Sequence, residues 1–167
     1  MSNQQERLRI EAWIVGFTDG EGCFSVSFIK NKTTKTGWQI FPEFVITQGA
    51  KSIQALKVFQ TYFGVGKIFG NKRTDNHREH LCRYCVRSLR DLENTIVPFF
   101  EKNNLTTYKQ NDFLLFRKII LLMVEQKHLT QKGMKQIALL VQKMNRRKPS
   151  RFLESSETIR RAPVKTG

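Results

Sequence analysis

IVGFTDGEGC, residues 14–23, is the stretch that decides how this chain folds. Apolar residues lead up to two carboxylates, Asp19 and Glu21, which are separated by a glycine. The apolar part continues a helical pattern that starts near Gln5, and a helix that is apolar all round is buried on all sides. Residues 23–30, CFSVSFIK, instead alternate between apolar and small polar side chains, as a β-strand does. The sequence therefore predicts a buried helix that turns directly into a strand.

The end of this helix raises an electrostatic question. A helix C-terminus carries partial negative charge, so acidic side chains are disfavoured there and cations are favoured. Asp19 and Glu21 stand at that end, and a positive partner is therefore expected beside them. Gly16 lies inside the same helix, where a glycine costs about 1 kcal/mol relative to alanine. Ala12, Gly16 and Gly20 are spaced four apart, which lets a second helix approach closely.

The rest of the chain predicts two hairpins and a set of helices. Strand patterns occupy 23–30, 38–48, 66–72 and 81–88, and helical patterns occupy 52–64, 91–102, 108–126 and the segment after Thr130. Pro42 indicates an edge position or a bulge in its strand. We expect an α+β fold, an αββαββα-type single domain with helices on one face of a four-stranded antiparallel sheet. Residues 1–147 would form it, and residues 148–167 a basic C-terminal tail that is at best a partly ordered helix.

The charge of the chain indicates a polyanionic partner. Its 29 Lys and Arg against 14 Asp and Glu give a net charge of +15, an excess that is usually matched to nucleic acid. The basic residues are spread over several segments, unlike the polybasic cluster of a membrane-surface protein. No apolar run reaches the roughly 20 residues of a membrane span, and no signal sequence opens the chain. Three cysteines do not suggest a disulfide framework, so we expect an intracellular protein.

The opening stretch also carries a family resemblance. IVGFTDGEG at 14–22 resembles the nine-residue signature of the LAGLIDADG homing endonucleases, and Glu21 takes the position that is acidic in that family. Three further segments follow in the family's order and approximate spacing: FVITQ at 44–48, FGVGKI at 63–68 and LTTYKQNDFLLF at 105–116. The resemblance covers most of residues 8–145.

The resemblance implies an endonuclease that makes a double-strand break in a long, pseudo-palindromic DNA site and so serves intron homing. One signature is present, which implies the single-motif type, in which two copies form a homodimer. The dimer interface would run along Ala12, Gly16, Asp19 and Gly20. No small-molecule cofactor and no membrane partner are implied, and the location would be an organelle such as a chloroplast or mitochondrion.

A divalent metal ion is the implied cofactor. The Glu21 carboxylates of two copies and the carbonyl oxygens near Gly20 are hard oxygen ligands, which suit Mg²⁺ or Mn²⁺. Ca²⁺ is expected to support DNA binding without cleavage. The metal would also be the positive partner that the helix end requires.

Two further residues match catalytic positions of the family. Gln48 corresponds to a polar residue that orders active-site water, and Lys109 to a basic residue that stabilises phosphate charge. In some single-motif members the lysine stands two positions earlier, where this chain has Thr107, so Lys102 remains an alternative. Asp19 is expected to be structural and not a direct metal ligand.

A two-stranded ribbon fits the major groove of DNA, where all four base pairs are distinguishable. Arg83 and Arg87, in alternating register, are natural readers of guanine. Phe41 and Phe69 on the same face would contact thymine methyls, unless the register is off by one residue. The predicted DNA-contacting strand residues are Ser25, Ser27, Ile29, Gln39, Phe41, Glu43, Lys67, Phe69, Asn71, Arg83, Cys85 and Arg87. The basic residues suited to phosphates are Lys32, Lys35, Lys72, Arg73, Arg146, Arg147 and Lys148.

Two other functions compete with the nuclease. A non-catalytic protein of the same fold, an RNA maturase or a DNA-binding regulator, has no use for mutually repelling carboxylates such as Glu21. A zinc-stabilised module would use His77, His80, Cys82 and Cys85. Four ligands so close in sequence hardly surround one tetrahedral ion, and Cys82 and Cys85 would point to opposite faces of a strand.

Overall fold

Helices and strands follow one another in the predicted order in a computed structural model that describes residues 3–71 and 80–144. The elements are α1 (Asn3–Glu21), β1 (Gly22–Lys30), β2 (Trp38–Gly49), η1 (Ala50–Ser52), α2 (Ile53–Phe63), β3 (Lys67–Asn71), β4 (Leu81–Val86), α3 (Leu89–Asp91), η2 (Leu92–Ile96), α4 (Val97–Lys102), α5 (Lys109–Val124), η3 (Lys127–Leu129) and α6 (Gln131–Gln142). The predicted α+β fold with αββαββα order is confirmed. The predicted boundary near residue 147 and the basic tail lie outside the described residues.

The four strands form one antiparallel sheet in the order β1-β2-β4-β3. All of β1 pairs with residues 38–46 of β2, whereas β4 pairs only with residues 44–49. The first half of β2 therefore has an open edge on the side of β4, and Pro42 lies in that half. Because a proline has no N–H to donate to a neighbouring strand, it is tolerated at such an edge. The predicted edge position is correct, and the unbroken register with β1 leaves no bulge there.

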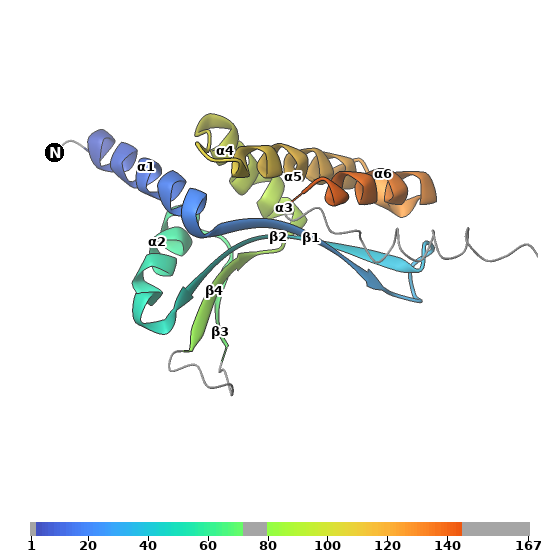
Figure 1. Ribbon diagram of the computed structural model, residues 1–167, viewed down its shortest axis with the longest axis horizontal. Helices are drawn as coiled ribbons and strands as arrows, with labels where there is room; N and C mark the ends of the chain where they lie inside the picture. Colours follow the sequence, from blue (N-terminus) through green and yellow to red (C-terminus); the bar gives the residue numbers. More distant parts are fainter. Residues whose placement is uncertain (1–2, 72–79, 145–167) are drawn as a thin grey trace, which may run out of the picture.

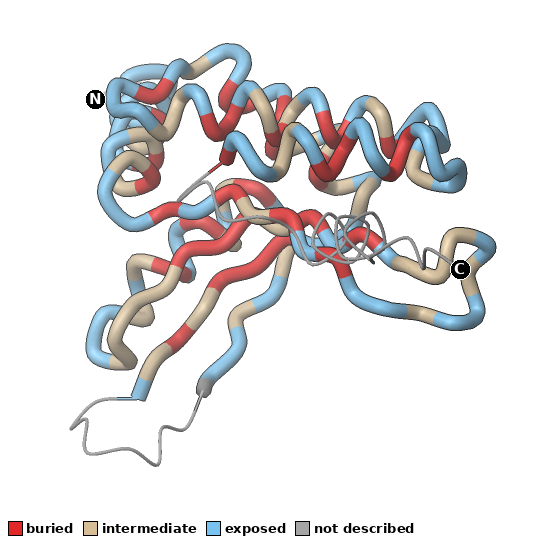
Figure 2. Tube along the Cα trace, turned by 45° about the vertical axis from the view of Figure 1, so that its right-hand side comes forward, coloured by how far each residue is buried: buried red, intermediate tan, exposed pale blue. Residues whose placement is uncertain are grey.

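Among the described residues, the helices pack on one face of the sheet and leave the other open. Figure 1 shows the sheet as an arch with α4, α5 and α6 above it. On the covered face the Phe24 ring lies 5.3 Å from those of Phe100 and Phe116, and the Phe44 ring 6.5 Å from that of Phe59, measured between centroids. Figure 2 shows the buried residues concentrated between these two layers. In the described part of the chain no helix is long and apolar enough to cross a membrane.

Helix α1 differs from its prediction. It buries only Glu11, Ile14 and Thr18, all on the face turned to the rest of the protomer. Ala12 and Gly16, on the opposite face, are exposed. The expectation of burial on every side is therefore wrong for a single chain, because no element of the described residues covers Ala12 and Gly16.

Candidate active site

The chain passes from helix to strand without a loop, since α1 ends at Glu21 and β1 begins at Gly22. A Cβ atom on Gly22 would lie 2.8 Å from the Thr18 carbonyl oxygen and 2.6 Å from the Thr18 methyl carbon. Only a glycine allows this close approach, which explains the second glycine of the DGEG sequence. The tight turn leaves Glu21 exposed directly before the first strand of the sheet.

Lys109, the first residue of α5, supplies a positive charge at the end of α1. Its Nζ donates a hydrogen bond of 2.8 Å to the Thr18 carbonyl oxygen. The last four carbonyls of a helix have no partner within the helix, and a cation is favourable at that end. The sequence-based expectation gave this role to a metal ion, whereas the structure gives part of it to a lysine of the chain itself.

The hydrogen bond to the Thr18 carbonyl holds the Lys109 ammonium at the last turn of α1, which ends at Glu21. Burial lowers the pKa of the Lys109 ammonium below its usual value, and nearby acidic groups oppose that effect in part. These groups are Cys23, Asp19, Glu21 and Asp112, taken in order of decreasing influence. A partly desolvated ammonium interacts more strongly with an anion than one that is fully in water. The site can therefore stabilise negative charge that develops on a phosphate.

Asp19 is held entirely by its own chain. Its Oδ2 accepts a hydrogen bond of 2.7 Å from the Thr106 N–H, and its Oδ1 accepts bonds from the Thr107 N–H at 3.1 Å and the Thr107 hydroxyl at 2.7 Å. Burial raises the pKa of the Asp19 carboxyl, but these hydrogen bonds lower it by more, so it lies below its usual value. Both oxygens already have donors, which agrees with a structural role and not with metal ligation. These contacts lie within one chain, and the place of Asp19 in a dimer interface stays a prediction.

Gln48 lies at the same end of the sheet as Glu21. Gly22, which follows Glu21, pairs with Ile46, and Gln48 stands two residues further along β2. It is partly exposed and opposite Cys82 of β4. The fold therefore brings the polar side chain at the end of β2 to the level of the helix-to-strand turn.

The alternative lysine is directed elsewhere. Lys102 Nζ lies 3.4 Å from Glu11 Oε2 in an ion pair. Glu11 precedes Glu21 by ten residues, which is about 15 Å along a helix. Of the two lysines considered, Lys109 is the one that the fold brings to the acidic turn, and Thr107 instead supplies a hydroxyl to Asp19.

The chemistry of the donors at the turn fits a hard divalent cation. The Glu21 carboxylate and the Gly20 carbonyl are the kind of oxygen ligand that Mg²⁺ prefers. Within residues 3–71 and 80–144, however, no three His, Cys, Asp or Glu side chains come together as a metal site. The described part of one protomer therefore offers no more than part of such a ligand set.

The predicted DNA-contacting side chains of the strands share one face of the sheet. The cross-strand pairs are Ser25 with Glu43, Ser27 with Phe41, Ile29 with Gln39, Lys67 with Cys85, and Phe69 with Arg83. Residues paired across a sheet project to the same side. This side is the open face, because the alternate residues form the core. The predicted register is therefore correct, and contact with DNA remains a prediction.

Exposure separates the members of this face. Phe41 and Phe69 are 38% and 44% exposed, so their position is real and not a register error. Cys85 is only 3% exposed, because it lies at the middle of the sheet between β2 and β3, and it is not accessible to a ligand. Asn71 is the last residue of β3. Lys32 and Lys35 are exposed in the loop between β1 and β2.

Glu43 organises the basic part of the open face. Its Oε2 accepts a hydrogen bond of 2.8 Å from Arg87 Nε, and its Oε1 lies 3.4 Å from Arg83 Nη2. The Arg87 guanidinium is also 5.5 Å from the centroid of the Phe69 ring, a cation–π distance. An exposed aromatic ring on this face thus supports one of the two arginines.

Some predicted positions lie outside the described residues: Lys72, Arg73, His77, Arg146, Arg147 and Lys148. For the zinc alternative, Cys82 pairs with Gln48 and Gly70 on the covered side, whereas Cys85 pairs with Val45 and Lys67 on the open side. The two thiols therefore project to opposite faces of β4, as expected from the strand period.

Three contributors to the site were missed from the sequence. They are the Thr18 carbonyl, the Thr107 hydroxyl and Glu11, which anchors α1 through Tyr62. A threonine directly before a helical pattern is a capping signal, and a glutamate within an otherwise apolar helix is a signal for a buried polar contact. Their partners are far away in the sequence, so no local pattern identifies them.

The arched antiparallel sheet, entered from a helix that ends on carboxylates, defines a distinct class of α+β protein. Residues 14–120 match the LAGLIDADG endonuclease family, and the chain belongs to this family. The probable intron-encoded endonuclease 2 of Neurospora crassa is 37% identical over 127 residues, which are 75% of this chain and 27% of that protein. The chain thus spans about a quarter of the length of this relative.

Solved structures show the same fold. The homing endonuclease I-TnaI is 37% identical with a TM-score of 0.79, and the match covers 89% of this chain and 97% of that one. The LAGLIDADG homing endonuclease I-SmaMI bound to cleaved DNA is 36% identical with a TM-score of 0.78, and the match covers 90% of this chain and 48% of that one. I-SmaMI has also been solved on an uncleaved DNA target in the presence of calcium ions.

Proposed function

We propose that this chain is a site-specific DNA endonuclease that cuts both strands of a long, near-palindromic duplex by metal-dependent phosphodiester hydrolysis. The observation that carries the proposal is the placement of an exposed carboxylate, Glu21, beside the partly buried ammonium of Lys109. Anionic and cationic groups at one turn suit the binding of a metal ion and the stabilisation of a phosphate. The DNA-bound state of I-SmaMI supports DNA as the substrate class.

The open face of the sheet is proposed as the DNA-binding surface. Its arch is curved like a saddle, and Arg83 and Lys67 project from the strands. Arg87 directly follows β4, and Lys32 and Lys35 stand in the loop between β1 and β2. Strand residues are suited to base edges in the major groove, and loop lysines are suited to phosphates. Cys85 is left out of this surface because it is buried.

We assign the catalytic work to three residues. Glu21, with the Gly20 carbonyl, would hold a divalent cation such as Mg²⁺ or Mn²⁺, which when bound activates water and stabilises the leaving oxygen. Lys109 keeps its proton and donates N–H to a non-bridging phosphate oxygen, so charge on the phosphate is compensated. Gln48 orients the attacking water through its amide. Ca²⁺ is expected to allow binding without cleavage, in keeping with the calcium complex of I-SmaMI.

A homodimer is proposed because one protomer is incomplete. A Cβ atom on Gly16 or Gly20 would meet no atom of the described residues within 4 Å, so nothing in that part of the protomer requires glycine there. Ala12 lies on the same exposed stripe of α1. A second α1 packed on this stripe would bring two Glu21 side chains to one centre and form an isologous interface.

The biological role proposed is intron homing, within an organelle. The intron-encoded relatives support it, but they are much longer than this chain. The rival role is that of a non-catalytic RNA maturase or DNA-binding regulator with the same fold.

The decisive experiment uses the purified chain, a library of randomised DNA duplexes and Mg²⁺, with Glu21→Gln run in parallel. The wild type is expected to cut at one near-palindromic site, and the variant is expected to bind that site without cutting. Binding without cutting by the wild type would favour the rival role. Full cleavage by Glu21→Gln would remove Glu21 from the mechanism.

A further inference from the structure

Helix α1, which ends on Glu21, is held on its own protomer by directional polar contacts as well as by apolar packing. Its three buried residues include only one apolar side chain, Ile14, beside Glu11 and Thr18. Ile14 and the partly buried Ile10, Val15 and Phe17 pack against the core, but apolar packing is non-directional and restrains sliding and rotation of a helix only weakly. Hydrogen bonds to fixed partners are directional and set the position of the helix.

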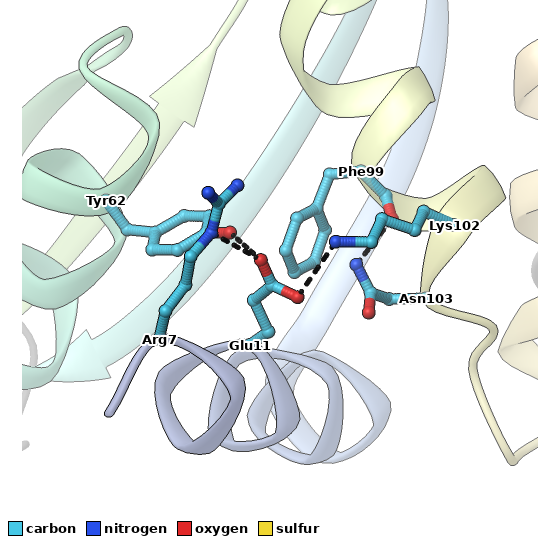
Figure 3. Close-up of polar contacts among 6 residues, drawn as sticks. All are labelled: Arg7, Glu11, Tyr62, Phe99, Lys102 and Asn103. Atoms are coloured by element: carbon cyan, nitrogen blue, oxygen red, sulfur yellow. Dashed lines mark hydrogen bonds and ion pairs between the residues drawn. The ribbon is translucent and has the colours of Figure 1, made fainter. Parts of the chain in front are cut away.

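The first fastening is at Glu11. Figure 3 shows its carboxylate between side chains of α1, α2 and α4. Glu11 is 3% exposed, and it accepts hydrogen bonds from the Tyr62 hydroxyl at 2.7 Å and from Arg7 Nε at 3.0 Å. Lys102, at the end of α4, contributes a third contact at 3.4 Å. The contacts of Glu11 therefore join the middle of α1 to α2 and to the end of α4, which precedes α5 in the chain.

The second fastening is a closed ring of contacts around Asp19. The Thr107 hydroxyl donates to Asp19 Oδ1 at 2.7 Å and accepts a hydrogen bond of 3.3 Å from the Lys109 backbone N–H. The Lys109 side chain returns to α1 and donates to the Thr18 carbonyl oxygen at 2.8 Å. Thr18 and Asp19 are adjacent, so the ring joins the last turn of α1 to the first turn of α5 through both the backbone and the side chain of Lys109.

We propose that Asp19 is a positioning residue, which acts through the Thr107 hydroxyl to set the place of Lys109 relative to Glu21. This inference rests on the proposed nuclease function. Asp19 and Thr107 touch neither substrate nor metal in this scheme. They fix the point from which the lysine side chain extends, and a hydroxyl that both donates and accepts is required at residue 107.

Valine at residue 107 tests this requirement, since it keeps the shape of threonine and removes the hydroxyl. In Thr107→Val the single-turnover rate of cleavage at saturating protein is expected to fall by about 10- to 100-fold, because a misplacement of about 1 Å has effects of that size. Affinity for the target duplex in Ca²⁺ is expected to stay within about twofold, since Thr107 lies off the open face of the sheet. Thr107→Ser, which keeps the hydroxyl, is expected to cut at about the wild-type rate.

Thr130→Val is the matched control. Thr130 caps α6 and its hydroxyl accepts a hydrogen bond of 3.1 Å from the Gly133 N–H, far from Asp19 in the chain. Loss of this cap lowers the melting temperature by a few degrees. The cleavage rate should not change. An equal loss of rate in Thr130→Val, or a rate for Thr107→Val within twofold of the wild type, overturns the proposal.

Hydrogen exchange separates this inference from the nuclease proposal. The Thr106 and Thr107 amides are expected to exchange at least about tenfold faster in Asp19→Asn, because an amide has one acceptor oxygen where the carboxylate has two. Unchanged exchange in Asp19→Asn overturns the positioning role whether or not DNA is cut. If exchange is faster in Asp19→Asn but the wild type cuts no duplex, the contact of Asp19 with Thr106 and Thr107 is supported and the nuclease function is overturned.

Discussion

Arg87 donates a hydrogen bond of 2.8 Å from Nε to the carboxylate of Glu43 on the open face of the sheet. Arg83 approaches the other oxygen of the same carboxylate at 3.4 Å. One acidic side chain therefore holds both proposed readers of guanine before any DNA is present. An arginine that is already ordered loses less conformational entropy when it contacts a base.

Arg87→Ala is expected to weaken binding to the target by about 1–3 kcal/mol for each half-site, with the loss confined to one G·C pair in each half-site. The measurement is the Kd for the target and for a set of single base-pair variants. Lys32→Ala is the comparison, because loss of a loop lysine that contacts phosphate weakens binding to all duplexes alike and lowers the salt dependence by about one unit of slope per protomer. An Arg87→Ala protein that loses affinity for every duplex equally would show that Arg87 does not read sequence.

Lys109→Met is expected to lower the cleavage rate by about 10²–10³-fold with little change in DNA affinity, because methionine keeps the length of the side chain without its charge. The rate is measured in single turnovers with Mg²⁺, and affinity is measured with Ca²⁺. Lys102→Met is the control, since that lysine pairs with Glu11 and not with the turn at Glu21. If Lys102→Met abolishes cleavage and Lys109→Met does not, the two lysines have been assigned the wrong way round.

The sheet and its open face could be predicted because alternation is a local property. Residues 23–30 and 38–48 each carry the period of two, and the sides that they predict agree with the observed pairs such as Ser25 with Glu43. The glycine stop after α2 was equally local, since Gly64 adopts a positive φ of 66°.

The environment of α1 could not be predicted in the same way. The apolar pattern of α1 does not indicate whether its residues are covered by elements of the same chain. Ala12 and Gly16 are exposed in the single chain. The contacts of Asp19 with Thr106 and Thr107 join residues 87 and 88 positions apart. Such pairs depend on how helices pack in space, and a single sequence contains no periodic signal for them.

Glu11→Gln tests the polar fastening of α1 through its pH dependence. The Tyr62 hydrogen bond is the largest cause that lowers the pKa of Glu11, burial opposes it, and the net pKa is below the usual value. A carboxyl with a lowered folded-state pKa stabilises the fold above its unfolded pKa and loses that effect as the pH falls through the folded pKa. Glu11→Gln is expected to cost about 1–3 kcal/mol at pH 7.

Urea unfolding at pH 7 and below pH 4 measures this difference. The stability gap between wild type and Glu11→Gln should shrink at the lower pH, because the wild-type carboxyl is then protonated in part. Glu6→Gln, an exposed change on the same helix, is the control and is expected to leave the stability within about 0.5 kcal/mol. A gap that stays constant with pH would mean that the charge of Glu11 contributes nothing to the fold.

Gly16→Ala is expected to have different effects on the stability of the protomer and on the association of the proposed dimer. In the single chain the added methyl group meets no atom within 4 Å, and alanine favours a helix by about 1 kcal/mol over glycine. The protomer is therefore expected to be as stable as the wild type or more so. Across a close helix pair the same methyl group is overpacked, and association should weaken by about 1–3 kcal/mol with a matching loss of cleavage at low protein concentration.

Light scattering over a concentration series measures this association. Gly70→Ala is the control, since Gly70 also has open space around its Cβ position but lies on β3, away from α1. It is expected to leave the dimer unchanged. Because each copy of the proposed dimer contributes one Glu21 to a shared centre, loss of association and loss of cleavage must occur together. A Gly16→Ala protein that remains monomeric and still cuts both strands would show that one chain holds a complete active site.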